Sequence, residues 1–253
     1  MMIFVVGVVG LMLGSFLSVL IQRWPSWRGV AMGRSECPHC KHVLAWYDLI
    51  PLLSWVQLRG KCRYCRAPIS WFYPILEVSV ASALVASTII HGIGTEWYIA
   101  DLVMLFGLIT LFFFDLRHHM LPDAIMAPLA GLVILRLGML RPDLLLNNVA
   151  MGTLLAALVG LLYLVSNGRW IGFGDVKLAF VIGSLFGYPG AIGVTLIAIW
   201  TGALVGVALI ALRRASMETA LPFGSFWTAA AVMMILWPAP VHFLSGLLIP
   251  TFQ

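Results

Sequence analysis

Long apolar runs, each close to the length of a membrane crossing, dominate the chain. A helix that crosses the hydrocarbon core needs about 20 mostly apolar residues, and about eight runs approach that length. They are residues 2–22, 74–91, 97–115, 124–140, 146–166, 175–188, 190–212 and 226–248. The pattern predicts an all-α polytopic membrane protein. The break at 187–190 is the least marked, and without it the prediction is seven spans.

The composition agrees with this pattern, since 62% of the 253 residues are apolar and 10% are charged. A soluble chain carries about 25% charged residues. The net charge of +5 does not indicate a nucleic-acid partner, because the basic residues gather at the ends of apolar runs. Residues 1–22 have no charge and Arg23 follows them, which predicts an uncleaved first span with its N-terminus outside.

The basic residues also predict the orientation of the spans. With the N-terminus outside, the cytoplasmic segments are 23–73, 116–123, 167–177 and 213–225. Thirteen of the 15 basic residues then lie on the cytoplasmic side, as the positive-inside rule requires. The membrane lipid is therefore an expected partner, and nucleic acid is not.

Two Cys-x-x-Cys pairs stand in the one long cytoplasmic segment. They are Cys37 with Cys40 and Cys62 with Cys65, separated by 21 residues. This spacing is typical of a zinc ribbon, and four thiolates form a closed structural site. The sequence therefore predicts a first transmembrane helix (1–22), a small cytoplasmic zinc domain (23–73) and a membrane core (74–253).

Other readings of the cysteines are two disulfides or free thiols. A cytosolic location disfavours disulfides, and His39 and His42 are substitute ligands of lower rank. The apolar insert 49–55 is too short to cross a membrane, so we expect it to pack on the membrane face or on the spans.

Two aspartates lie at the cytoplasmic ends of apolar runs. Asp115 ends one run, and Asp175 opens another after Gly172 and Gly174. A carboxylate within a membrane costs roughly 2.5–3.5 kcal/mol or more, so both need a reason to be there. Two adjacent carboxylates share a proton and can hydrolyse a peptide as aspartic proteases do. The alternative is a proton-coupled transporter.

Three more charged residues accompany the pair. Glu77 is a further carboxylate inside an apolar run and needs a partner or a function. Lys177, near Asp175, is a candidate contact for a substrate carboxylate, or it extends to the membrane interface. Asp123 precedes an apolar run, where we expect it to cap the helix.

Several stretches together resemble one family, the type IV prepilin peptidases, which are membrane aspartic proteases of the Gly-x-Gly-Asp type. The resemblance rests on residues 14–25, the cysteine pairs with Gly60-Lys61-Cys62, Tyr73-Pro74 with Glu77, Asp115 with Leu121-Pro122-Asp123, Gly172 to Leu178, and Pro222-Phe223-Gly224. It spans residues 10 to 226.

The resemblance implies an enzyme of the bacterial inner membrane with its active site facing the cytoplasm. It would cleave the leader of type IV prepilins or type II secretion pseudopilins, then N-methylate the new N-terminal residue with S-adenosylmethionine. A peptidase without methyltransferase activity is the alternative. The implied residues are Asp115 and Asp175 for catalysis and Gly60 and Glu77 for methyl transfer. Gly172, Gly174 and Lys177, which surround Asp175 in the sequence, are the expected substrate-binding residues.

The chain departs from the family pattern at two serines. Ser18 stands where asparagine is more usual, and Ser225 stands where proline often follows Phe-Gly. We expect neither serine to contact the aspartate pair.

Overall fold

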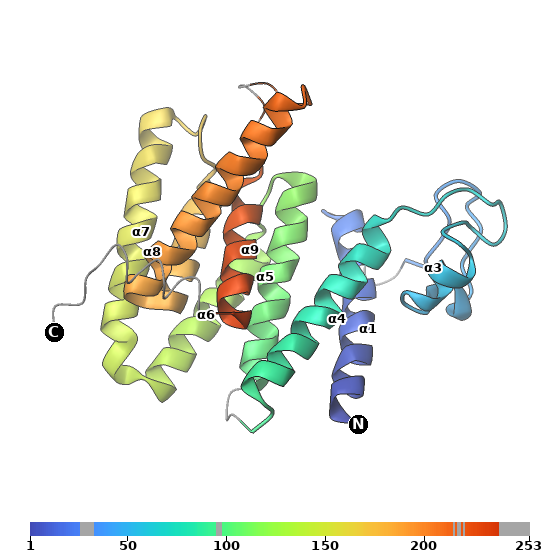
Figure 1. Ribbon diagram of the computed structural model, residues 1–253, viewed down its shortest axis with the longest axis horizontal. Coiled ribbons are helices and arrows are strands. Elements are labelled where there is room, and N and C mark those ends of the chain that lie inside the picture. The colour runs from blue at the N-terminus through green and yellow to red at the C-terminus, as the bar shows by residue number, and fades with distance from the viewer. Residues whose placement is uncertain (26–32, 95–97, 215, 217–218, 220, 238–253) are drawn as a thin grey trace. The chain divides into compact units, whose positions relative to one another are not determined.

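The computed structural model describes residues 1–25, 33–94, 98–214, 216, 219 and 221–237. The chain divides into two compact units, Met1–Thr95 and Glu96–Gln253 (Figure 1). The first unit holds α1 (Met2–Arg23), the 3-10 helix η1 (Trp46–Leu49), α3 (Leu53–Gln57) and α4 (Phe72–His91). The second holds α5 (Tyr98–His118), α6 (Asp123–Leu140), α7 (Pro142–Ser166), α8 (Phe173–Ala211) and α9 (Phe223–Leu236).

Within the described part of the chain, six helices are long and apolar enough to cross a membrane: α1 and α4 to α8. This finding confirms the prediction of a multi-pass helical membrane protein. The eighth expected run, 226–248, begins within α9, and its residues from 238 onward lie outside the described residues.

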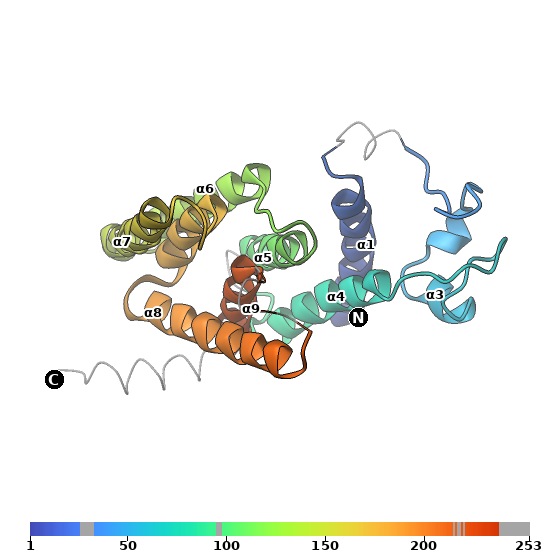
Figure 2. The same ribbon diagram turned by 90° about the horizontal axis from the view of Figure 1, so that it is seen from above.

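In the first unit, α1 and α4 lie side by side (Figures 1 and 2). Two glycines of α1 allow this approach. A Cβ at Gly14 would lie 2.6 Å from the Cα of Glu77, and a Cβ at Gly10 would lie 2.6 Å from the Cα of Ala81. Small residues let helix backbones come close in a membrane, where packing replaces the hydrophobic effect as the driving force.

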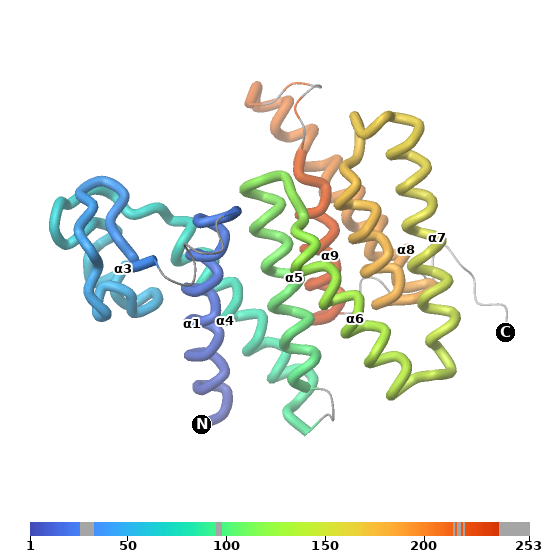
Figure 3. The backbone as a smooth tube through the Cα atoms, turned by 180° about the vertical axis from the view of Figure 1, so that it is seen from behind, coloured from blue at the N-terminus to red at the C-terminus, as the bar shows by residue number. Residues whose placement is uncertain are grey.

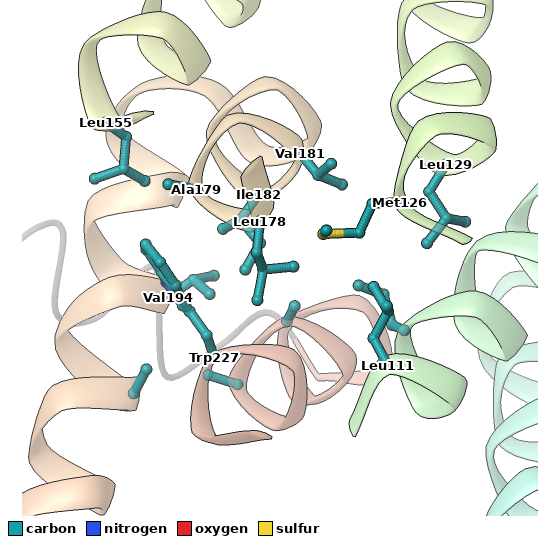
Figure 4. Packing of buried hydrophobic residues seen from close by; sticks show 14 of the residues in the cluster. Leu111, Met126, Leu129, Leu155, Leu178, Ala179, Val181, Ile182, Val194 and Trp227 are labelled. Atoms are coloured by element: carbon teal, nitrogen blue, oxygen red, sulfur yellow. The ribbon is translucent and has the colours of Figure 1, made fainter. Parts of the chain in front are cut away.

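In the second unit, α9 lies between α5 and the second half of α8 (Figure 2). The first half of α8 packs on α6 and α7, and α6 and α7 are joined by a short turn (Figure 3). Buried side chains from all five helices meet in one core. Figure 4 shows Leu111 of α5, Met126 of α6, Leu155 of α7, Ile182 of α8 and Trp227 of α9 in it.

Helix α8 contains the expected runs 175–188 and 190–212. Its 39 residues would extend about 58 Å, roughly twice the hydrocarbon thickness. The helix is interrupted by non-helical dihedral angles at Gly187 and Tyr188, and its halves run in different directions (Figure 2). The side-chain amide of Asn148 donates to the carbonyl of Ser184, 3.0 Å away, so a neighbouring helix satisfies backbone freed near the break.

Candidate active site and metal centre

Asp115 lies in the last turn of α5, and its side chain is buried. One carboxylate oxygen, Oδ2, accepts two hydrogen bonds from Ser225. The Ser225 backbone N–H donates over 2.6 Å and its hydroxyl over 2.9 Å. Ser225 is in the first turn of α9, where backbone N–H groups lack partners within the helix. The Asp115 carboxylate therefore accepts a backbone N–H at the start of α9, although the two residues are 110 positions apart in the sequence.

The expectation that Ser225 does not contact the aspartate pair is wrong. Ser225 is buried, and both of its donors point at Asp115. No spacing along the chain indicates this contact, because only the packing of α9 on α5 creates it. The one available signal was a serine directly after the Phe223-Gly224 pair at the start of an apolar run.

Asp175 lies in the first turn of α8 and is half-buried. Its Oδ2 accepts a hydrogen bond from the N–H of Gly172 over 3.1 Å. Gly174, which precedes Asp175, and Gly224, which lies beside Asp115, are both placed against Leu121. The structure thus brings the end of α5 and the start of α8 together, and the two aspartates with them.

Leu121, in the turn after α5, packs against the start of both later helices. A Cβ at Gly174 would lie 3.1 Å from the Cβ of Leu121, and a Cβ at Gly224 would lie 3.1 Å from its Cδ1. The Gly224 Cβ would also lie 3.0 Å from Asp115 Oδ2. Real Cβ atoms rarely come this close, so a side chain at either position would force its neighbours to shift by a few tenths of an ångström. The two glycines let α8 and α9 begin beside the same leucine, next to the carboxylates.

Asp123 does not cap α6, so this expectation is wrong. The N-cap is Pro122, and no side-chain hydrogen bond caps the helix. Asp123 instead receives both of its close contacts from Lys177, whose Nζ lies 2.6 and 2.7 Å from the two carboxylate oxygens. Lys177 also lies over the ring of Phe173. This ion pair joins the starts of α6 and α8. Lys177 lies on the face of α8 opposite Asp175, so its partner is Asp123 and not Asp175.

The four cysteines converge from two hairpins. Their Sγ atoms all lie within 4.8 Å of one another, and those of Cys37 and Cys65 are 3.8 Å apart. A tetrahedral zinc ion with Zn–S bonds of 2.3 Å holds its sulfurs about 3.8 Å apart. All four are free thiols, so they form no disulfides and the set fits a metal ion.

The two hairpins repeat one backbone pattern. In the first, the N–H of Lys41 donates to the carbonyl of Cys37 over 2.9 Å; in the second, Arg66 donates to Cys62 over 3.0 Å. Both donors have positive φ angles, 58° and 60°. Each hairpin then closes with one bridge, Glu36 to Val43 and Lys61 to Pro68. This turn directs both cysteines of a pair to the same point.

The thiols influence one another's ionisation. The N–H of Cys40 donates to Cys37 and lowers the pKa of Cys37 to about 6, against the opposing effect of burial. The N–H of Ala67 lowers the pKa of Cys65, but desolvation and hydrogen bonds with the other thiols outweigh it and raise that pKa to about 11. Adjacent thiolates repel each other, and a bound cation removes this repulsion.

Asp48 connects the second cysteine hairpin to the segment between the two hairpins, a role that the sequence did not indicate. Its carboxylate accepts from Arg63 over 2.7 Å, from the Tyr64 hydroxyl over 3.1 Å and from the N–H of Ala45 over 3.3 Å. Burial raises the pKa of Asp48, but these donors outweigh burial and lower that pKa below its usual value. The anion is therefore the stable form in the folded domain.

Gly60 and Glu77 have local structural partners in the first unit. Gly60 has a φ of 68°, and a Cβ there would lie 2.9 Å from the ring of Trp55, so no other residue fits well. Glu77 is buried and accepts the N–H of Leu52 over 2.7 Å and the hydroxyl of Ser15. Glu77 thus has the partner that an intramembrane carboxylate requires.

The fold and the site define a class: a multi-pass helical membrane protein with two aspartates at helix ends around one leucine, and a tetra-cysteine domain. Two family models match, the bacterial peptidase A24 N-terminal domain over residues 8–91 and the type IV leader peptidase family over residues 102–207. No solved structure matches the chain.

Curated relatives agree with the family models. The prepilin leader peptidase/N-methyltransferase of Aeromonas hydrophila is 34% identical over 257 residues, covering 90% of this chain and 88% of the relative. The protein of the same name from Stutzerimonas stutzeri is 31% identical, covering 91% and 89%, and that of Myxococcus xanthus is 38% identical, covering 84% and 64%. The chain belongs to the type IV leader peptidase family.

Proposed function

We propose that this protein cleaves the leader peptide of type IV prepilins or pseudopilins and that Asp115 and Asp175 carry out the hydrolysis. The observation that supports the proposal is the convergence of the end of α5, with Asp115, and the start of α8, with Asp175, around Leu121. The family membership favours a peptidase over the alternative of a proton-coupled transporter.

The chemistry follows from two carboxylates that hold one proton between them. The ionised carboxylate accepts a proton from a water molecule as the water oxygen attacks the scissile carbonyl. The protonated carboxylate donates a hydrogen bond to the carbonyl oxygen. When the C–N bond breaks, a carboxylic acid proton passes to the leaving amine, and the pair returns to its shared-proton state.

Neighbouring residues would position the pair and the peptide. Ser225 fixes one oxygen of Asp115. A Cβ at Gly172 would meet only Asp175 and the Gly174 nitrogen, so this exposed backbone is open to an extended substrate. Lys177 would contribute a positive charge beside the site, already balanced by Asp123.

The charge distribution supports a cytoplasmic active site in the bacterial inner membrane. Within the second unit, five of the seven basic residues lie at the end of α5 or near the starts of α8 and α9, as the positive-inside rule describes for the cytoplasm.

The experiment is prepilin cleavage by membranes that carry Asp115→Asn or Asp175→Asn. Asparagine accepts the same hydrogen bonds and caps helices well, so each variant keeps the structural role and loses only the acid–base chemistry. We expect both to cleave at least about a thousandfold more slowly. The matched control is Asp101→Asn, because Asp101 is also on α5 but pairs with Arg136 near the opposite end. Undiminished cleavage by either dyad variant contradicts the proposal.

For the first unit we propose a structural zinc ion on Cys37, Cys40, Cys62 and Cys65, and N-methylation of the new N-terminal residue with S-adenosylmethionine as donor. The sulfur geometry fits the ion, and the relatives are named as methyltransferases. Gly60 and Glu77 remain the candidate residues for methyl transfer. Mass spectrometry of the mature substrate tests this activity: without the added methyl group, the protein is a peptidase only.

A further inference from the structure

The segment between the cysteine hairpins exposes large apolar side chains. We define the interfacial patch as the following exposed residues of the first unit: Trp46, Leu49, Leu53, Val56 and Trp71. Trp46 is 76% exposed and Trp71 65%. Neither the metal centre nor the aspartate chemistry uses these side chains, although exposing them to water is costly.

A buried hydrogen bond sets the depth of this patch. The N–H of Leu52 donates to Glu77 over 2.7 Å, and Glu77 is on α4, a candidate membrane span. Glu77 follows Phe72, where α4 begins, by five residues, or about 7.5 Å along the helix. The backbone next to Leu53 therefore lies level with the first turns of the span rather than above them.

Further contacts hold the segment beside the ends of both spans of this unit. The rings of Trp55 and Trp71 are 4.2 Å apart, which ties α3 to the residue before α4. At the end of α1, Arg23 donates to the carbonyls of Gly33 and Arg34, each over 2.9 Å. The domain is thus held at both of its ends.

The patch continues into the exposed side of α4. Trp71, Ile75 and Val78 follow one another at helical spacing, and all three are exposed. On a membrane-spanning helix such a stripe faces the lipid. The interfacial patch lies at the same depth as these residues and continues from them, so it also faces lipid.

The charge of the domain fits one side of a bilayer. Residues 33–71 carry six basic and two acidic side chains, and Arg59 and Lys61, just after α3, are exposed. Anionic headgroups of the cytoplasmic leaflet attract basic residues at the surface, by about 1 kcal/mol each.

We infer that the interfacial patch inserts into the inner leaflet of the bilayer, with Leu53 and Val56 at the acyl-chain boundary and Arg59 and Lys61 among the headgroups. The domain would then lie against the membrane rather than project into the cytosol. This inference does not depend on the proposed proteolysis.

The test places a photo-crosslinking phenylalanine analogue at Leu53 or Val56 of the full chain, in nanodiscs of phosphatidylethanolamine and phosphatidylglycerol. Mass spectrometry then counts lipid adducts. The control is the same analogue at Lys41, an exposed residue of the first cysteine hairpin. The reference for lipid contact is Leu204 of α8, which is 75% exposed. Because insertion buries apolar side chains in lipid, we expect at least about fivefold more lipid adducts at 53 and 56 than at 41.

Adduct yields at 53 and 56 no higher than at 41 overturn the inference. So does crosslinking mainly to a second copy of the chain, or to peptides of the second unit, since each means that protein covers the patch.

A second measurement needs no substitution. Hydroxyl-radical footprinting of the unaltered protein in nanodiscs compares Trp46 and Trp71 with Tyr64, which is 41% exposed. Insertion protects the two tryptophans, so they should be labelled less than Tyr64 although the protein itself leaves them more open. Stronger labelling of both tryptophans contradicts the inference, whatever the crosslinking variants show.

Discussion

The four-cysteine cluster of the first unit and the aspartate pair of the second reach their geometry by different routes. Each cysteine pair is held by one tight hairpin, in which the carbonyl of the first cysteine accepts an N–H from four residues further on. The aspartates instead depend on three helix ends, those of α5, α8 and α9, which meet around Leu121. A locally built site should tolerate distant changes, whereas a site made by packing should be sensitive to them.

The clearest separation of the two regions is expected from the loss of one cysteine ligand. Cys62→Ser removes one of four thiolates, and we expect metal content to fall by at least about tenfold, because the closed site needs all four ligands. Methylation of the product should fall with it, while leader cleavage by the second unit should persist within a few-fold. Metal analysis of purified protein and mass spectrometry of the product measure both.

His39→Ala is the matched control, since it changes an exposed residue within the same hairpin. We expect this variant to keep its metal. If it loses the metal as Cys62→Ser does, a histidine belongs to the ligand set. Loss of leader cleavage together with the metal would show that the two regions are not independent.

The next effect tests the packing of the second region. Gly224→Ala places a Cβ about 3 Å from both Asp115 Oδ2 and Leu121, so one of these side chains or the start of α9 must shift by a few tenths of an ångström. Because misplacing catalytic groups by about 1 Å costs about a hundredfold, we expect this smaller shift to slow cleavage by roughly thirtyfold. Gly131→Ala is the control, since a Cβ there meets nothing within 4 Å; equal loss in both variants would contradict this explanation.

A smaller effect concerns Ser225. Ser225→Ala removes the hydroxyl donor and leaves the backbone N–H, so we expect kcat to fall about tenfold, the value of one hydrogen bond to a charged group. KM should stay unchanged, because Ser225 holds Asp115 and not the substrate. Ser225→Thr keeps the hydroxyl and should restore most of the rate. A change in KM alone would mean that Ser225 contacts the peptide instead.

The smallest effect is expected from the ion pair of Asp123 and Lys177. Asp123 is 68% and Lys177 37% exposed at the side chain, so water weakens their attraction. A double-mutant cycle of Asp123→Asn and Lys177→Met, read as denaturant unfolding in detergent, should give a coupling of about 0.5 kcal/mol. A coupling several times larger would show that the pair lies in a water-free site.

Much of the fold was predictable from the sequence, because the lengths of the apolar runs reflect the thickness of a bilayer. Runs such as 74–91 and 146–166 lie within single helices. The break near Gly187 was predicted as a turn between two apolar runs, and non-helical angles at Gly187 and Tyr188 separate two helical halves there. Its geometry depends on Asn148 of α7, a contact between helices that no local pattern contains.

The sequence by itself determined the membrane class, the paired cysteines and the positions of the two aspartates, since apolar length, ligand spacing and charge at span ends act locally along the chain. Only the tertiary structure decided the partners of those residues. Ser225 reaches Asp115, Lys177 turns to Asp123, and Leu52 binds Glu77. These contacts join residues far apart in sequence, and the close packing of helix ends selects them.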